Sequence, residues 1–289
     1  MIRPAPGLAI LLCLAPVLRA AAPDPAEARL AALEARAGGR LGVAALDTGS
    51  GQRLAHRAGE RFPLCSTFKV LLAGAVLAQV DAGRERLDRR IPYGKADLLA
   101  WAPVTRARVA EGGMAVGDLC AAAVEASDNT AANLLLAALG GPSAVTAFAR
   151  SLGDPTTRLD RTEPALNEAR PGDPRDTTTP EAMVGSLQAL LLGQALAPGS
   201  RVRLEGWMTA CTTGGARLRA GLPKDWGVGD KTGSGARGTV NDVAILRPPG
   251  RPPILVAAYF TGSTASGKDR DAVLAEVGRI VAGAFREAK

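Results

Sequence analysis

The sequence predicts an α+β fold in which segments from both ends of the chain share one antiparallel sheet. Strand-like stretches bounded by turn residues occur near the N-terminus and again from Trp226 onward, whereas the middle of the chain has a mostly helical pattern. Apolar residues make up 47% of the 289 residues, which is ample for a large core. We expect terminal helices to cover the sheet and central helices to form a second lobe.

The first 22 residues are typical of a secretory signal peptide. Arg3 supplies a positive charge, residues 7–18 form an apolar run, and small residues at 20–22 offer a cleavage site. The run is too short to span a membrane. We therefore expect a periplasmic protein with no membrane segment after cleavage. Its remaining cysteines would be Cys65, Cys120 and Cys211. Because this number is odd, at least one thiol stays free.

The segment after the signal peptide predicts a helix followed by a β-hairpin. Asp24 is a suitable N-cap and Pro25 a suitable first helical residue, so the helix runs to about residue 36. Residues 40–47 and 52–57 form the expected strands, with a glycine-containing turn between them. The second strand carries the one histidine of the chain, His56, so zinc sites that need two histidines are excluded.

The C-terminal part completes the expected sheet. It predicts three strands and a closing amphipathic helix, at residues 226–232, 239–247, 253–261 and 271–287. The resulting division is an α/β lobe of residues 23–60 and 215–289, and a helical lobe of residues 61–214, with the active site at their junction. Gly233 to Gly238 match G-x-G-x-x-G, but a strand rather than a helix follows, so this pattern does not indicate nucleotide binding.

The net charge of +7 is spread over scattered arginines rather than gathered in one basic cluster. No basic cluster is interleaved with aromatic residues, so nucleic acid is not an expected partner. We expect a monomer that acts on a small molecule, with no metal and no organic cofactor.

A possible nucleophile lies at the start of the first central helix. Pro63 prevents a helix from running through from upstream, and dense apolar residues follow from Ser66 onward. Ser66 would then lie on the first turn, where free backbone N–H groups favour negative charge. Lys69 follows three residues later on the same face, so its ammonium can reach the Ser66 hydroxyl. A serine beside a buried amine is an activated nucleophile.

Three further polar patterns occur downstream of Ser66. Ser127, Asp128 and Asn129 interrupt two buried helices, at 117–126 and 130–139, where such residues usually form caps and turns. Residues 152–176 form a long irregular segment, which is usually functional in a compact domain. Arg161 and Asp176 could pair across its neck. The segment contains Glu163-Pro164-Ala165-Leu166-Asn167, and the last pattern is Lys231-Thr232-Gly233.

Together these patterns resemble class A serine β-lactamases, whose signature is S-x-x-K with S-D-N and K-T-G. The resemblance covers essentially the whole mature chain and implies the β-lactamase and transpeptidase type of α+β fold. It implies hydrolysis of penicillins and cephalosporins, and hence antibiotic resistance. Activity against extended-spectrum cephalosporins or carbapenems is left open.

The resemblance also implies roles for the catalytic residues. Ser66 would attack the lactam carbonyl, with Lys69, or Glu163 through a water, as the base. Ser127 would relay a proton to the ring nitrogen. Glu163 would then activate the water that releases the product, and Asn167 would hold that water. The backbone N–H groups of Ser66 and Ser234 would stabilise the oxyanion.

Other residues match substrate-binding positions of the family. Lys231, Thr232, Gly233 and Ser234 would receive the substrate carboxylate. Asn129 would contact its side-chain amide and Trp101 would stack at the rim. Many relatives have a further arginine on the neighbouring strand, where this chain has Val240; Arg217 matches an alternative position. Arg161 and Asp176 match the ion pair that closes the segment carrying Glu163.

Two departures concern cysteines. Cys120 matches one end of a disulfide found in many relatives, but Ala73 occupies the other end. Cys65 matches one end of a disulfide of carbapenem-hydrolysing relatives, but Gly235 occupies its partner's place.

The alternatives are a penicillin-binding DD-peptidase, a β-lactam sensor that stays acylated, and a structural protein with a decayed site. The Glu163 to Asn167 element argues against the peptidase. The absence of a membrane span after cleavage argues against the sensor, and the filled catalytic positions argue against a decayed site.

Overall fold

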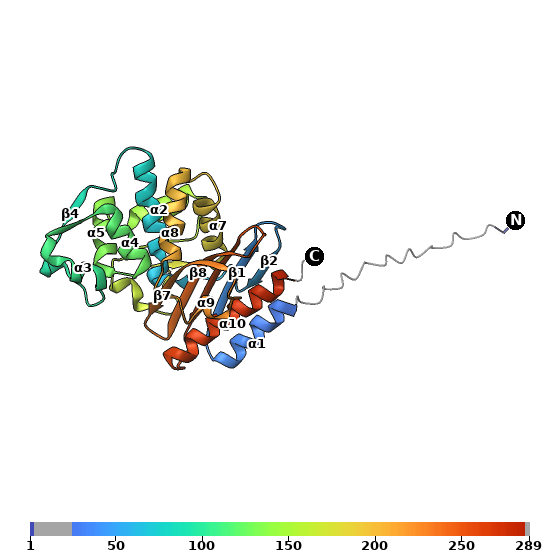
Figure 1. Cartoon of the computed structure of the whole chain (residues 1–289). Helices are drawn as coiled ribbons and strands as arrows, with labels where there is room; N and C mark the ends of the chain where they lie inside the picture. The colour runs from blue at the N-terminus through green and yellow to red at the C-terminus, as the bar shows by residue number, and fades with distance from the viewer. Residues whose placement is uncertain (3–24, 287–289) are drawn as a thin grey trace.

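The structure is a computed structural model that describes residues 1–2 and 25–286. Its central feature is a five-stranded antiparallel sheet in the order β2-β1-β9-β8-β7 (Figure 1). The strands are β1 (Arg40–Asp47), β2 (Arg53–His56), β7 (Gly227–Gly235), β8 (Thr239–Arg247) and β9 (Ile254–Thr261). β1 pairs with β9 along its whole length. The prediction of one sheet built from both ends of the chain is therefore confirmed.

The two terminal helices, α1 (Pro25–Ala37) and α10 (Gly267–Arg286), lie side by side on one face of the sheet (Figure 1). Their buried apolar side chains, together with those of the short helix α9 (Leu218–Gly221), pack against the strand residues that point to this face of the sheet, in one core cluster. The helix face that packs is thus the apolar stripe expected of an amphipathic helix.

The opposite face of the sheet is covered by the helical part of the chain. The helix α2 (Phe68–Asp81) lies at its centre, and every residue from Phe68 to Leu77 is buried. A helix that is apolar on all sides belongs inside a core. Around it lie α3 (Pro103–Ala107), α4 (Val116–Glu125), α5 (Asn129–Leu139), α6 (Pro142–Ser151), α7 (Pro180–Leu191) and α8 (Pro198–Thr209). Apolar residues of these helices and of β1, β8 and β9 form one second core.

Two small ladders lie outside the main sheet and were not expected. β3 (Phe62–Pro63) pairs with β6 (Thr177–Thr178), and β4 (Arg90–Pro92) pairs with β5 (Gly113–Ala115). Strands of two or three residues are too short to show a period of two, so the sequence gives no pattern to read. The first ladder ties the chain just before Ser66 to the end of the long irregular segment.

Ser66 lies in a 3₁₀ turn, η1 (Cys65–Thr67), that leads directly into α2, rather than in the first α-helical turn. Short 3₁₀ helices also occur between the longer elements, namely η2 (Lys95–Asp97), η3 (Val109–Glu111) and η4 (Ala165–Glu168). Residues 3–22 of the expected signal peptide, the N-cap Asp24 and the helix end at Glu287 lie outside the described residues.

Within the described part of the chain, no single helix has the length and apolar composition needed to cross a membrane. The pair α5 and α6 meets those limits only when counted together, and it is bent by 73°.

Candidate active site

Ser66 lies where α2 begins, beneath the edge of the sheet formed by β7. The backbone turns sharply before it, since Cys65 has a φ of +43°. The side chain of Asn241 on β8 donates to the carbonyl oxygens of Pro63 (2.8 Å) and Leu64 (3.1 Å), which fixes this turn against the sheet. Ser66 is 8% exposed, and its Oγ donates to Glu163 Oε1 at 3.1 Å.

Lys69 lies one turn further along and is fully buried. Its Nζ donates to Ser127 O at 2.8 Å and to Asn129 Oδ1 at 2.6 Å, and it is 3.1 Å from Glu163 Oε1. Lys69 was expected to contact Ser66 directly. Instead, both side chains contact Glu163 Oε1, which is 3.1 Å from Ser66 Oγ and 3.1 Å from Lys69 Nζ. Burial lowers the pKa of Lys69, and the adjacent Glu163 carboxylate opposes that shift.

The Ser127-Asp128-Asn129 turn joins α4 to α5. Asp128 caps α5 by accepting from the backbone N–H of Ala131, and its other oxygen accepts from the N–H groups of Val104 and Thr105. The cap thereby fixes the segment that follows Trp101 to the same turn. Ser127 has a φ of +57°, which turns the chain between the two helices.

The Ser127 hydroxyl lies between the buried amino groups of two lysines. Lys231 Nζ donates to Ser127 Oγ at 3.0 Å, and Lys69 Nζ is 3.4 Å from the same oxygen. Burial, and secondly the positive charge of Lys69, lower the pKa of Lys231 to about 7. A hydroxyl in this position can pass a proton between groups on either side.

Glu163 lies in the long irregular segment, preceding a cis peptide bond to Pro164. Its Oε2 accepts from Asn167 Nδ2 at 2.5 Å, while its Oε1 faces Ser66 and Lys69. The segment is closed by the ion pair of Arg161 Nε with Asp176 Oδ2 at 2.6 Å. The carboxylate is therefore held by its own segment and directed at the serine.

The β7 strand supplies the other side of the site. Thr232 Oγ1 is 2.6 Å from Thr213 Oγ1, and Arg217 donates to Ser234 Oγ at 2.7 Å. Arg217 is itself held by Asp271 at 2.8 Å. In the ladder with β8, Val240 lies opposite Ser234 and carries no charge. The positive charge beside Ser234 comes instead from the buried Arg217.

These groups surround a cavity of about 360 Å³. It is lined by Ser66, Trp101, Ser127, Asn129, Asn167, Thr213, Arg217, Thr232 and Ser234. Lys69, Glu163 and Lys231 lie buried behind this lining. Trp101 is 54% exposed at the rim, and its indole N–H donates to Ala126 O at 3.1 Å. All four sequence patterns therefore meet at one concave site. Serine and threonine hydroxyls line the cavity, and the charged groups of Lys69, Glu163 and Lys231 lie buried beneath them.

Comparison with known proteins gives a consistent answer. Residues 25–285 match the model of the β-lactamase enzyme family. The chain belongs to this family. It is 47% identical to β-lactamase OXY-2 of Klebsiella oxytoca, over 95% of this chain and 96% of that enzyme. It is 51% identical to β-lactamase CTX-M-97 of Escherichia coli, over 89% of this chain and 88% of the relative.

Solved structures place it in class A. An ancestral (GNCA) class A β-lactamase is 63% identical, with a TM-score of 0.89, over 90% of this chain and all of that one. A putative class A β-lactamase, PenP from Rhodopseudomonas palustris, is 58% identical with a TM-score of 0.89 over the same shares. The α+β fold of this class A β-lactamase is thus shared with its relatives.

Three residues that hold the β-lactamase site were missed from the sequence: Asn133, Thr213 and Asn241. Asn133 binds the backbone of Glu163, Thr213 contacts Thr232, and Asn241 fixes the turn before Ser66. The only available signal was an amide inside a mainly apolar stretch, as for Asn133 in α5 and, beside Asp242, Asn241 in β8. Buried amides need partners, so such positions are candidates for long-range contacts.

Cys65, Cys120 and Cys211 are all buried free thiols. A Cβ added to Gly235 would come within 2.7 Å of Cys65 Sγ and 2.9 Å of Asn167 O, so glycine lets β7 approach both.

Proposed function

We propose that this β-lactamase hydrolyses the β-lactam ring of penicillins and cephalosporins through an acyl-enzyme on Ser66, and so confers antibiotic resistance. The observation that carries the proposal is the contact of Ser66 Oγ with Glu163 Oε1 at 3.1 Å, with Lys69 on the same carboxylate oxygen. A serine hydroxyl donating to a carboxylate is in position to lose its proton as it attacks.

In acylation, Ser66 Oγ bonds to the lactam carbonyl carbon as its proton passes to Glu163 or, through the shared network, to Lys69. The burial that lowers the pKa of Lys69 makes a neutral amine accessible, while Glu163 is the group in direct contact with Ser66. The oxyanion would be stabilised by the backbone N–H groups of Ser66 and Ser234, which line the same cavity.

As the carbon–nitrogen bond breaks, the departing nitrogen needs a proton. Ser127 Oγ is the donor we propose, because it lines the cavity and is 3.0 Å from Lys231 Nζ and 3.4 Å from Lys69 Nζ. Either ammonium can return a proton to the hydroxyl after transfer.

Deacylation requires a water that attacks the ester. Glu163 would take its proton, the carbonyl carbon would bond to its oxygen, and Ser66 Oγ would leave with a proton returned by Glu163. Asn167 Nδ2 holds Glu163 Oε2, and Asn167 Oδ1 is buried without a partner among the described residues, so it can accept from the attacking water.

The substrate carboxylate would bind to Thr232, Ser234 and the charge of Lys231, with Arg217 reinforcing Ser234 from behind. Asn129 and Trp101 line the other side of the cavity and would contact the acylamide side chain. We further propose that the protein is exported to the periplasm through its N-terminal signal peptide and acts there as a monomer.

A DD-peptidase or a sensor is not favoured, because Glu163 and Asn167 form a complete water-activating pair beside Ser66. The test is intact-mass spectrometry of the protein with benzylpenicillin while loss of the lactam ring is followed. Turnover with only a transient adduct supports the proposal. A stable adduct without turnover, or neither adduct nor turnover, would contradict it.

A further inference from the structure

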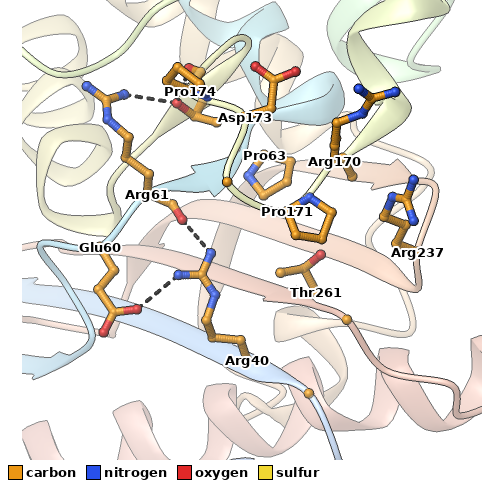
Figure 2. A pocket seen from close by; sticks show the side chains of 15 residues that line it. Arg40, Glu60, Arg61, Pro63, Arg170, Pro171, Asp173, Pro174, Arg237 and Thr261 are labelled. Carbon is orange, nitrogen blue, oxygen red and sulfur yellow. Dashed lines mark hydrogen bonds and ion pairs between the residues drawn. The ribbon is translucent and has the colours of Figure 1, made fainter.

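A second and larger cavity, of about 600 Å³, lies outside the active site (Figure 2). It is formed by the end of the long irregular segment (169–174), the start of β1, the chain before β3, the turn between β7 and β8, and the end of β9. It shares no lining residue with the cavity at Ser66. An occupant of this second cavity therefore need not overlap with a β-lactam.

The charged residues of this cavity are mostly cationic. Arginines line it at positions 40, 61, 170 and 237, against the two carboxylates of Glu60 and Asp173. Both carboxylates already have cationic partners, since Glu60 pairs with Arg40 at 2.9 Å and Asp173 pairs with Arg175 at 2.6 Å. The cavity thus has an excess of positive charge that its own acids do not neutralise.

Two of the four arginines are occupied by the fold. Arg40 donates to Glu60 and to Arg61 O, and lies over the Phe62 ring. Arg61 donates to Thr156 O and Thr177 Oγ1, both at 2.9 Å. These two arginines are held in place by their contacts with the protein and have fewer donors available for a ligand.

The other two arginines have donors to spare, and both lie along one side of the cavity in Figure 2. Arg237 makes no side-chain hydrogen bond or ion pair with any described residue, and Arg170 has one ion pair, with Glu168 at 3.0 Å. A guanidinium presents five donors in a planar fork that fits a carboxylate. Arg170 and Arg237 can therefore receive an anionic group between them.

The remaining lining is largely apolar. Pro63, Pro171 and Pro174 form it with Ala169, and Figure 2 shows Pro63 and Pro171 between the two arginine sides. Ring faces of proline suit a flat organic body better than they suit a small hydrated ion.

From this geometry we propose that the cavity binds a small organic anion, a carboxylate on a flat apolar body. Arg170 and Arg237 bind the carboxylate, and the proline faces cover the body. The Gly233 to Gly238 pattern thus contributes to a binding site through Arg237 in its turn, although not to a nucleotide site.

The location connects this site to the long segment that carries Glu163. Asn167 O accepts from Ala236 N at 2.9 Å, which joins the segment to the β7–β8 turn. Arg170 follows Asn167 by three residues and Arg237 follows Ala236 by one. An anion bound to both arginines bridges the same two pieces of chain, so it stabilises the closed segment. Inhibition or activation through this site would not require overlap with a bound β-lactam.

The test is isothermal titration calorimetry with naphthalene-2-carboxylate as the probe at low ionic strength. The site variant is Arg170→Gln with Arg237→Asn, because asparagine tolerates the φ of +55° at position 237. The matched control is Arg53→Gln with Arg203→Gln, which removes two exposed arginines without side-chain partners among the described residues. The active-site variant Ser234→Ala shows whether the probe binds at Ser66 instead. Arg237→Asn alone is the second variant, in case the double variant unfolds.

We expect binding to the unaltered protein, the control and Ser234→Ala with equal affinity, and a loss of about tenfold or more in the site variant. Absence of binding to the unaltered protein, equal binding to the site variant, or a loss confined to Ser234→Ala would overturn the proposal. The measurement does not use hydrolysis, so its outcome is independent of the proposed activity.

Discussion

Asn133 on α5 holds the backbone of Glu163 by two hydrogen bonds. Its Nδ2 donates to Glu163 O and its Oδ1 accepts from Glu163 N, both at 2.9 Å. The helix that begins at the Ser127 turn therefore also fixes the carboxylate that faces Ser66. One rigid element aligns the two halves of the proposed mechanism.

Replacement of Asn133 by alanine removes both bonds. We expect a loss of about 1–2 kcal/mol in the free energy of unfolding and a fall of about tenfold or more in kcat, because Glu163 is no longer fixed. The matched control is Thr146→Val, since Thr146 Oγ1 makes two similar bonds to the backbone of Leu159 in the same segment. Urea unfolding and benzylpenicillin kinetics check both. Equal losses of kcat in the two variants would show that Asn133 is only structural.

The pKa of Lys231, lowered to about 7 by burial and by the neighbouring Lys69, predicts a pH-dependent KM. Above that pKa the free enzyme has a neutral Lys231, so binding of the substrate carboxylate must include uptake of a proton. KM for benzylpenicillin should therefore rise between about pH 6 and pH 8. Lys231→Arg keeps its charge over this range and should flatten the rise. A KM of the unaltered enzyme that does not change with pH would refute the prediction.

The Arg161–Asp176 ion pair should stabilise the long irregular segment. Asp176 is 1% exposed, and its Oδ1 also accepts from the N–H groups of Asp160 and Arg161. Asp176→Asn tolerates the φ of +55° but removes the buried carboxylate and leaves Arg161 paired with Glu168 alone among the described residues, so we expect a loss of about 2–3 kcal/mol in the free energy of unfolding. The control, Asp173→Asn, breaks a pair with the exposed Arg175 in the same segment and should change little. Denaturant unfolding checks both, and equal losses would contradict the assignment.

Burial of the Asp242 carboxyl should make the stability of the protein depend on pH. It is fully buried, and burial together with the charge of Asp230 raises its pKa well above the usual range. The native state thus favours the neutral acid, and stability falls as pH rises from the unfolded pKa of about 4 through the native value.

Asp242→Asn keeps an oxygen for the N–H of Leu218 and cannot ionise. The Tm of the variant should equal that of the unaltered protein near pH 4 and be higher near pH 8. Each kcal/mol or so gained in the free energy of unfolding should raise Tm by about 2–4 °C. The exposed Asp88→Asn is the control. A variant that loses stability as pH rises to the same extent as the unaltered protein would disprove this account.

The strands were predictable because their patterns are local. The segments 40–47 and 239–247 match β1 and β8 in full, since each is a mainly apolar run bounded by turn residues. The polar patterns predicted which segments meet at the site. These features depend on residues near one another in sequence.

The contacts of Lys69 were less predictable. Helical spacing shows that Ser66 and Lys69 share a face, but not that Glu163, 97 residues after Ser66, lies between their functional groups. The support from Asn133 and the arginine-lined cavity likewise depends on how distant segments pack. Sequence periodicity carries no information on such long-range partners.

The central claim is that Glu163 activates the water that releases the acyl group from Ser66. The most direct measurement is intact-mass spectrometry of Glu163→Gln after mixing with benzylpenicillin, followed over time. The matched control is Glu168→Gln, which removes a carboxylate from the 3₁₀ turn η4 just after Glu163, and Ser66→Ala should form no adduct. We predict a long-lived adduct of one benzylpenicilloyl group on Glu163→Gln and rapid turnover by Glu168→Gln. Release of the adduct by Glu163→Gln as fast as by the unaltered enzyme would contradict the account.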